Sequence, residues 1–216
     1  MTARTLTRRA FGLGLASALA GCQMNTENIQ SQEDWNKARP TADQSIVVGR
    51  IRWIEGGKER RMSNRFYSWG IDPRLRNLNT GKQTFAKLDE GGHFRWSLDP
   101  GIYVIDRLNY RDPVSGSYFF VPQIGFKVAK GGQVYYIGTL EVHFFPKRGT
   151  FGSLSGPALF GVKDEMRAEG DYIRRTLGVD PGKVGKALMV HDKKLPRSFD
   201  TTQEFNVGLT LLNAFF

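Results

Sequence analysis

Short apolar segments with a period of two, separated by turn residues, run from Ser45 to about residue 145 and constrain the fold most. In one of them Phe94, Trp96 and Leu98 share a face opposite Arg95 and Ser97, which is the pattern of a half-buried strand. We expect strands over 45–54, 66–71, 84–88, 94–98, 102–108, 118–121, 124–128 and 133–145. Short strands at this regular spacing predict a mainly β protein, an antiparallel β-sandwich over residues 46–145.

Turn chemistry divides these segments. Asp99-Pro100-Gly101 is a tight turn, because proline presets φ and glycine supplies a positive φ. Gly56-Gly57 is a second turn. Residues 72–82 contain Asp72-Pro73 and Asn79-Thr80-Gly81 and are expected to form a long loop.

The chain changes character after Pro146. Residues 147–161 contain four glycines and are expected to be a loop. Residues 163–177 predict a helix, with acids in its first turn, arginines in its last and Gly178 after it. Residues 204–216 alternate and predict a final strand or docked tail. We expect 146–216 to pack on the sandwich and to cover outward rings of three adjacent aromatic pairs: Phe119-Phe120, Tyr135-Tyr136 and Phe144-Phe145.

The start of the chain has the pattern of an export signal. A short apolar stretch over 11–20 ends in Leu19-Ala20-Gly21-Cys22, which contains the protein's one cysteine. The stretch is too short to span a bilayer, which needs roughly 20 residues. The pattern resembles a bacterial lipoprotein signal peptide. The resemblance implies that residues 1–21 are removed and that Cys22 carries diacylglyceryl and acyl chains that hold the protein to a membrane.

Two further features bear on the export route and on the membrane that the protein reaches. Thr7-Arg8-Arg9-Ala10-Phe11 resembles the twin-arginine export signal, although paired arginines also occur in ordinary secretion signals. Gln23 follows the cysteine. In similar lipoproteins an Asp at that position favours retention in the inner membrane, so Gln23 favours the periplasmic face of the outer membrane. Residues 22–45 are rich in Asn, Gln and Glu and are expected to be a flexible tether.

The residue types argue against a familiar catalytic centre. His93, His143 and His191 are far apart and lack metal-ligand spacing, so we expect no metal and no cofactor. Ser153 and Ser155 do not form the Gly-x-Ser-x-Gly elbow of a hydrolase. With Cys22 lipidated no disulfide can form, and the hydrophobic core alone must hold the domain.

The positive charge is concentrated near the first strand. The chain has a formal net charge of +10, and residues 46–82 hold nine basic residues against three acids. Outside the cytoplasm such a patch would attract lipopolysaccharide or anionic lipid headgroups, not nucleic acid. A merely solvated positive face is the alternative. The candidate residues for anionic-surface binding are Arg50, Arg52, Lys58, Arg60, Arg61 and Arg65.

The segments Gly92–Val104, Phe126–Val128 and Val134–Thr139 resemble the carboxypeptidase-regulatory-like, or transthyretin-like, β-sandwich modules. In those modules a Gly-x-Phe strand runs into a Leu-x-Pro-Gly-x-Tyr turn, and a Tyr-Ile-Gly strand follows in some bacterial lipoproteins. The resemblance implies a fold and a binding or scaffolding role, and it supplies no catalytic residues.

Together these features predict a non-catalytic, lipid-anchored binding or structural module of the cell envelope. One alternative is an accessory subunit of an envelope transport or secretion assembly, held by a protein partner. The other is an enzyme with a non-standard site in the end loops of the sandwich.

Overall fold

The computed structural model describes residues 39–62, 69–112, 116–148 and 154–195. Several predictions fall outside these residues and are not tested by the structure. They concern the signal peptide with Arg8 and Arg9, Cys22 and most of the tether, Arg65, and the strand or tail over 204–216.

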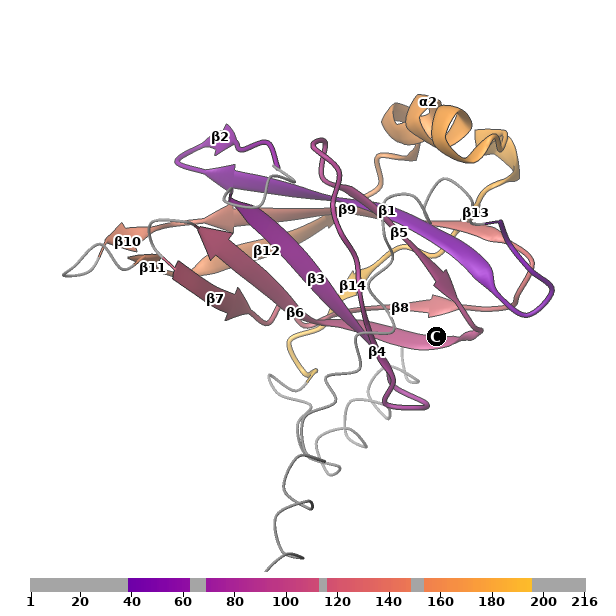
Figure 1. Cartoon of the computed structure of the whole chain (residues 1–216), viewed down its shortest axis with the longest axis horizontal. Coiled ribbons are helices and arrows are strands. Elements are labelled where there is room, and N and C mark those ends of the chain that lie inside the picture. The colour runs from indigo at the N-terminus through magenta and orange to yellow at the C-terminus, as the bar shows by residue number, and fades with distance from the viewer. Residues whose placement is uncertain (1–38, 63–68, 113–115, 149–153, 196–216) are drawn as a thin grey trace, which may run out of the picture.

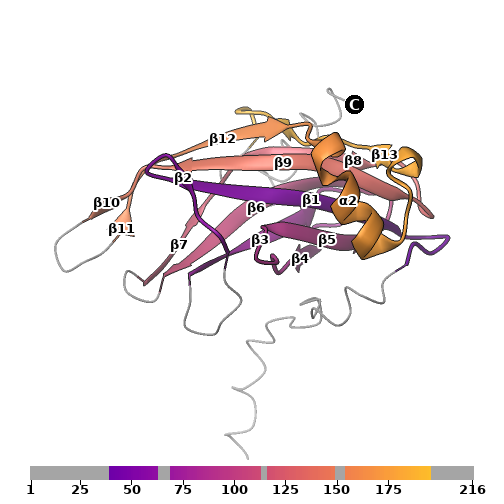
Figure 2. The same cartoon turned by 90° about the horizontal axis from the view of Figure 1, so that it is seen from above.

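Two β-sheets pack face to face, and a single described α-helix lies on the outer face of one of them (Figures 1 and 2). The first sheet has the order β12-β9-β1-β2, with β13 also along β9 and β5 along β1. Its strands are β1 (Ser45–Glu55), β2 (Lys58–Glu59), β5 (His93–Leu98), β9 (Val134–Phe144), β12 (Ala158–Lys163) and β13 (Gly185–Lys186).

The second sheet has the order β14-β8-β6-β3-β4, with β7 also along β6. Its strands are β3 (Gly70–Asn77), β4 (Gln83–Phe85), β6 (Gly101–Asp112), β7 (Gly116–Phe120), β8 (Ile124–Val128) and β14 (Val190–His191). Strands β10 (Lys147–Arg148) and β11 (Leu154–Ser155) form a small hairpin. The predicted fold class, a β-sandwich with a helix in its C-terminal part, is confirmed.

Two strand pairings depart from the antiparallel pattern, that of β1 with β9 and that of β13 with β9. Strands β1 and β9 run parallel at the centre of the first sheet, and β9 carries a bulge opposite Gly49. Gly138 adopts φ +97° at this bulge. A Cβ atom on Gly49 would lie 2.6 Å from the Phe94 ring, so the close approach of β1 to its neighbours requires glycine there.

The predicted loop over 72–82 is wrong in its first half, because β3 extends from Gly70 to Asn77. The Pro73 carbonyl accepts a hydrogen bond from the Ala86 amide, beyond the last residue of β4. The proline nitrogen points to that same side. The missing N–H therefore removes no ladder hydrogen bond to β6, and the strand continues through the proline.

The predicted loop over 147–161 is wrong as well. It contains β10, β11 and the first residues of β12, which pairs antiparallel with the edge of β9 from Ala158↔Phe144 to Lys163↔Thr139. The sequence does not indicate β12, because its glycine-rich surroundings suggest a loop and because pairing through backbone groups leaves no side-chain pattern. Leu159 also stays exposed, so β12 has no regular buried face.

The main core lies between the sheets and is rich in aromatic rings. Trp53 of β1 is fully buried and contacts rings from both sheets, including Tyr110 of β6 and Phe144 of β9. As the alternation predicts, Phe94, Trp96 and Leu98 also point into this core.

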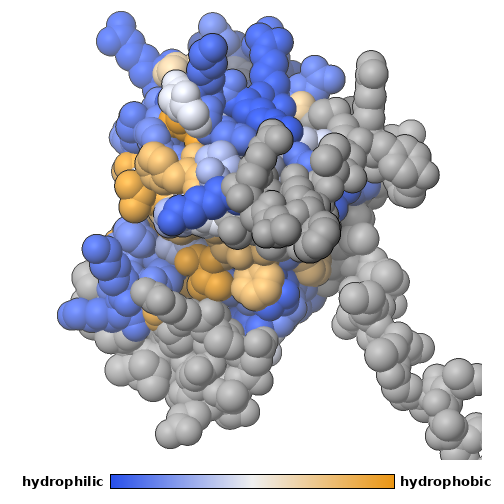
Figure 3. Space-filling view, turned by 90° about the vertical axis from the view of Figure 1, so that its left-hand side faces the viewer, coloured by the Kyte–Doolittle hydropathy of each residue, from blue (hydrophilic) through white to orange (hydrophobic). Residues whose placement is uncertain are grey.

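The three aromatic pairs differ in how their outward rings are covered. Tyr136 is buried beneath the helix, as predicted. Phe119 and Phe145 are about half exposed, at 52% and 50%. Phe145 follows β9 where the chain leads into β10. Figure 3 shows that end of the molecule, where apolar side chains lie among hydrophilic ones.

Helix α2 (Met166–Leu177) covers part of the outer face of the first sheet (Figure 2). Its Ile173 and Leu177 pack on outward residues of β1 and β9, which are Ile46, Val48, Val134 and Tyr136. The helix ends at Gly178, in the left-handed conformation at φ 66°. Among the described residues no helix has the length and apolar character to cross a membrane.

Candidate functional site

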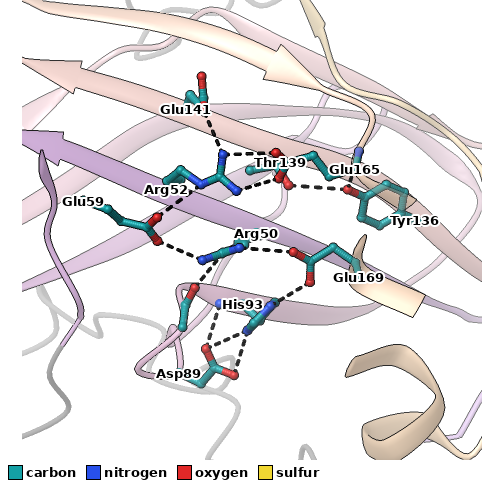
Figure 4. A network of polar contacts seen from close by, with 11 residues as sticks. Arg50, Arg52, Glu59, Asp89, His93, Tyr136, Thr139, Glu141, Glu165 and Glu169 are labelled. Atoms are coloured by element: carbon teal, nitrogen blue, oxygen red, sulfur yellow. Dashed lines mark hydrogen bonds and ion pairs between the residues drawn. The ribbon is translucent and has the colours of Figure 1, made fainter. Parts of the chain in front are cut away.

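A network of charged side chains fills the space between the first sheet and the start of helix α2 (Figure 4). We call it the α2 network. Its members are Arg50, Arg52, Glu59, Asp89, His93, Glu141, Glu165 and Glu169. The network draws on β1, β2, β5, β9, the loop before β5 and the start of the helix, so it links elements that are far apart in the sequence.

The two arginines come from alternate positions of β1 and therefore point to the same face, as predicted. Arg50 contacts Glu59 at 2.8 Å and Glu169 at 3.3 Å, and its Nε donates to the Gly91 carbonyl at 2.8 Å. Arg52 contacts Glu141 and Glu165, each at 2.9 Å, and lies 3.4 Å from Glu59. Both guanidinium groups are thus neutralised within the protein.

The start of the helix contributes two carboxylates, Glu165 at the N-cap and Glu169 in the first turn. Glu165 and Glu169 are four residues apart, so they lie on one face of the helix, which here faces the sheet. Negative side chains at this end are also favoured by the helix dipole. The backbone amide of Glu165 donates to the Tyr136 hydroxyl at 3.2 Å, which fixes the start of the helix on β9.

His93 is held between two carboxylates. Its Nδ1 lies 3.0 Å from Asp89 and its Nε2 lies 2.8 Å from Glu169. The ring of Tyr172 stacks on the imidazole, with centroids 3.7 Å apart. Burial alone would lower the pKa of His93, but its hydrogen bonds to Asp89 and Glu169 raise the pKa to about 8. The imidazole is therefore charged at neutral pH.

The pKa values of the carboxylates around His93 shift in the opposite direction, downwards. Burial alone would raise the pKa values of Asp89 and Glu169, but the hydrogen bonds and the charge of His93, together with backbone hydrogen bonds at Asp89 and with Arg50 at Glu169, lower both. The pKa of Glu141 is lowered in the same way by Lys163 and Arg52. All three groups stay ionised, and the result is a compact set of alternating charges.

This arrangement suits electrostatic attachment more than proton transfer. A general base needs a ring nitrogen within reach of a substrate proton, and both nitrogens of His93 already face carboxylates. In the described parts of the chain no group of three His, Cys, Asp or Glu side chains is placed to hold a metal ion. The ion pairs of Arg50, Arg52 and His93 with Glu165 and Glu169 tie helix α2 to the sheet.

The other predicted basic residues lie apart from this network. Arg60 contacts Glu55 at 2.9 Å and Asp112 at 3.4 Å, and its guanidinium lies over the Trp69 ring at 4.4 Å. Lys58 and Arg61 are exposed. Arg65 lies outside the described residues.

Sequence reasoning did not find the partners of the arginines. Arg50 and Glu169 are separated by 119 positions, and His93 and Glu169 by 76. From the sequence, Asp164 and Glu165 are taken as acids of the first turn and are explained by the helix dipole alone. The four-residue spacing of Glu165 and Glu169 next to a strand with two arginines on one face is the signal that could have indicated the pairing.

No protein-family model and no curated protein matches this chain. Among solved structures it is similar to a DUF3823 family protein from Parabacteroides merdae, with 17% identity and a TM-score of 0.30, over 47% of this chain and 46% of that one. A DUF3823 family protein from Bacteroides uniformis gives 15% identity and a TM-score of 0.26, over 64% and 59%. The matches span less than two thirds of either solved protein, and these TM-scores assign no family and no function.

The raised pKa of His93 predicts a pH-dependent stability. A group whose pKa is raised on folding stabilises the protein fully below its ordinary pKa of 6.5, and this contribution disappears as the pH rises through about 8. The shift corresponds to about 2 kcal/mol. We expect His93→Gln to destabilise the protein at pH 6, and the difference from wild type to shrink by about this amount at pH 9.

Urea unfolding at the two pH values measures this effect. His191→Gln is the control, because His191 is exposed on β14, and it should follow the wild-type pH dependence. A destabilisation by His93→Gln that is equal at pH 6 and pH 9 would contradict the assignment of a charged imidazole.

Proposed function

We propose that this protein is a lipid-anchored, non-catalytic binding or structural module of the cell envelope. The observation that carries the proposal is Leu19-Ala20-Gly21-Cys22 after a short apolar stretch, with a polar segment between Cys22 and the sandwich. The chains on Cys22 would hold the protein at the membrane, in our proposal on the periplasmic face of the outer membrane. Arg8 and Arg9 would direct export by the twin-arginine route.

The architecture of the described residues supports a binding role. The interior of the sandwich is filled by side chains, and the charged groups of the α2 network are paired with one another. A transthyretin-like module of this kind would work through its surface. The proposal therefore has the protein recognise another envelope component, and it assigns no reacting group.

Anionic envelope components remain our proposed ligands, with a changed set of contacts. Arg50, Arg52 and Arg60 are balanced by carboxylates, which weakens their attraction for an external anion. Exposed Lys58 and Arg61, which flank these arginines, keep the role proposed for the segment. Each basic side chain close to an anionic lipid surface contributes about 1 kcal/mol.

Replacement of Cys22 by serine tests the anchor. Each buried CH₂ of a lipid chain contributes about 0.8 kcal/mol, and stable attachment needs more than one chain. We expect Cys22→Ser to move the protein from the membrane fraction to the soluble fraction, or to leave the uncleaved precursor. Fractionation of cells followed by intact-mass measurement distinguishes the two.

The neighbouring substitution Gln23→Ser is the matched control and should leave the protein lipidated and membrane-bound. If Cys22→Ser is processed and fractionates like the wild type, the protein is not anchored through this cysteine and the proposal fails.

A further inference from the structure

Strand β12 forms an open edge of the first sheet (Figure 2). It pairs with β9 on one side and, in the described part of the chain, with no strand of that sheet on the other. Every residue of β12 is exposed or partly exposed, so nothing covers this edge completely. The free side of an edge strand presents unpaired backbone groups to which another strand can add.

The pairing with β9 decides which backbone groups of β12 are free. The Phe145 amide donates to the Pro157 carbonyl at 3.1 Å, one position before β12 begins. Hydrogen-bonded pairs alternate along an antiparallel ladder, so the odd-numbered residues of β12 direct their N–H and C=O groups to β9. The even-numbered residues direct theirs away from the sheet. These outward residues are Ala158, Phe160 and Val162.

This edge lacks the features with which proteins usually block strand addition, which are charges, prolines and very short strands. Strand β2, another edge strand of the same sheet, consists of Lys58 and Glu59, both charged and exposed. Strand β12 has six residues and no proline. Its one charged residue, Lys163, is the last of the strand and is paired with Glu141 at 2.8 Å. The edge is therefore suited to pairing.

The outer face of β12 carries a projection and a gap two positions apart. Leu159 projects into solvent and is 62% exposed. A Cβ atom at Gly161 would find open space, with no other part of the protein within 4 Å. The φ of Gly161 is not positive, so no turn requires glycine there. Glycine inside a strand often marks a close approach by another chain, and the gap can accept a side chain from outside.

We propose that β12 pairs antiparallel with β12 of a second copy of this chain and joins the two first sheets into one. A two-fold axis at Phe160 pairs all the outward backbone groups, Phe160 with Phe160 and Ala158 with Val162. In this register Leu159 of each copy lies opposite Gly161 of the other. These positions form a pair without hydrogen bonds, where opposite side chains are closest, so each leucine fills the gap of the other copy.

This complementarity favours a second copy over a strand of another protein. An unrelated strand would have to supply its own side chain for the gap and its own space for Leu159. Self-pairing supplies both from one sequence, because the two-fold axis lies midway between Leu159 and Gly161. The inference goes beyond the proposed envelope role and is independent of the lipid anchor.

Disulfide trapping with the full-length chain in detergent tests the register. Leu159→Cys and Gly161→Cys are prepared with tags of different size and mixed under mild oxidation. We expect the mixed pair to form a covalent dimer, because opposite positions meet the requirement that the Cα atoms lie within about 7 Å. Each variant alone should not, because like positions are also offset by two residues, about 7 Å along the strand. Wild type mixed with each variant controls for Cys22.

Sedimentation equilibrium in density-matched detergent tests the association itself. Leu159→Lys puts a charge on the edge, and Gly161→Leu fills the gap. Loss of two buried leucine side chains per dimer should weaken association at least about a hundredfold. Both variants should keep the wild-type far-ultraviolet circular dichroism spectrum, since both positions face open space. Phe119→Lys, at a half-exposed residue of the other sheet, is the matched control and should associate like the wild type.

The proposal is overturned if the wild type sediments as a monomer, which would leave the edge to a strand of another protein. It is overturned equally if the mixed cysteine variants cross-link no better than each variant alone, because the copies would then meet elsewhere or in another register.

Discussion

Replacing Trp53 by alanine should lower the free energy of unfolding by about 3–5 kcal/mol, the range for removing a large aromatic side chain from a core. The Trp53 ring lies 5.3 Å from Tyr110, 5.4 Å from Phe144, 5.6 Å from Phe120 and 6.0 Å from Trp69, measured between centroids. Its partners belong to both sheets, so the cavity would open at the seam of the sandwich.

Urea unfolding followed by far-ultraviolet circular dichroism measures this loss without relying on tryptophan fluorescence. Trp53→Phe keeps an aromatic ring and should lose less. Phe145→Ala is the matched control, because Phe145 is half exposed, and it should cost less than about 1 kcal/mol. Equal losses for Trp53→Ala and Phe145→Ala would show that Trp53 does not hold the sheets together.

Replacing Asp106 by alanine should cost about 3–5 kcal/mol, for an electrostatic reason. Its carboxylate binds Arg74 at 2.8 Å and Arg76 at 3.0 Å, and only 1% of the Asp106 side chain is exposed. The two arginine side chains are themselves mostly buried, at 14% and 9% exposure. Removing the carboxylate leaves two close positive charges without the group that holds them.

An exposed pair on the same sheet provides the control. Arg111 and Asp72 are 2.9 Å apart, but their side chains are 48% and 29% exposed, so Asp72→Ala should cost less than about 1 kcal/mol. Adding Arg74→Met and Arg76→Met to Asp106→Ala should restore much of the lost stability, because no buried charge then remains in the cluster. A small effect of Asp106→Ala at low salt would contradict the assigned role.

Asp106 illustrates why part of the fold could not be read from the sequence. Arg74 pairs with Arg107 and Leu75 with Ile105, so Asp106 is the extra residue of a bulge in β6. Alternation within residues 102–108 gives no sign of the bulge, because it depends on the register between two strands that are distant in the chain.

The candidate site, too, could be predicted from the sequence only in part. The sequence placed Arg50 and Arg52 on one face of a strand, because alternation is a local property of the backbone. It did not indicate that helix α2 would lay Glu165 and Glu169 against that face, since this requires the helix to dock on the first sheet. The same docking brings Glu169 to His93, where it joins Asp89 in raising the pKa of the imidazole.

The sequence by itself determined most of the strand segments between residues 45 and 145, the turn at Asp99-Pro100-Gly101, the helix before Gly178 and the inward face of β5, since period and turn chemistry act between near neighbours. The tertiary structure decided the parallel pairing of β1 with β9, the continuation of β3 through Pro73 and the burial of Arg95. These depend on which strands become neighbours and on what covers their outer faces, and contacts between residues far apart in the chain set both.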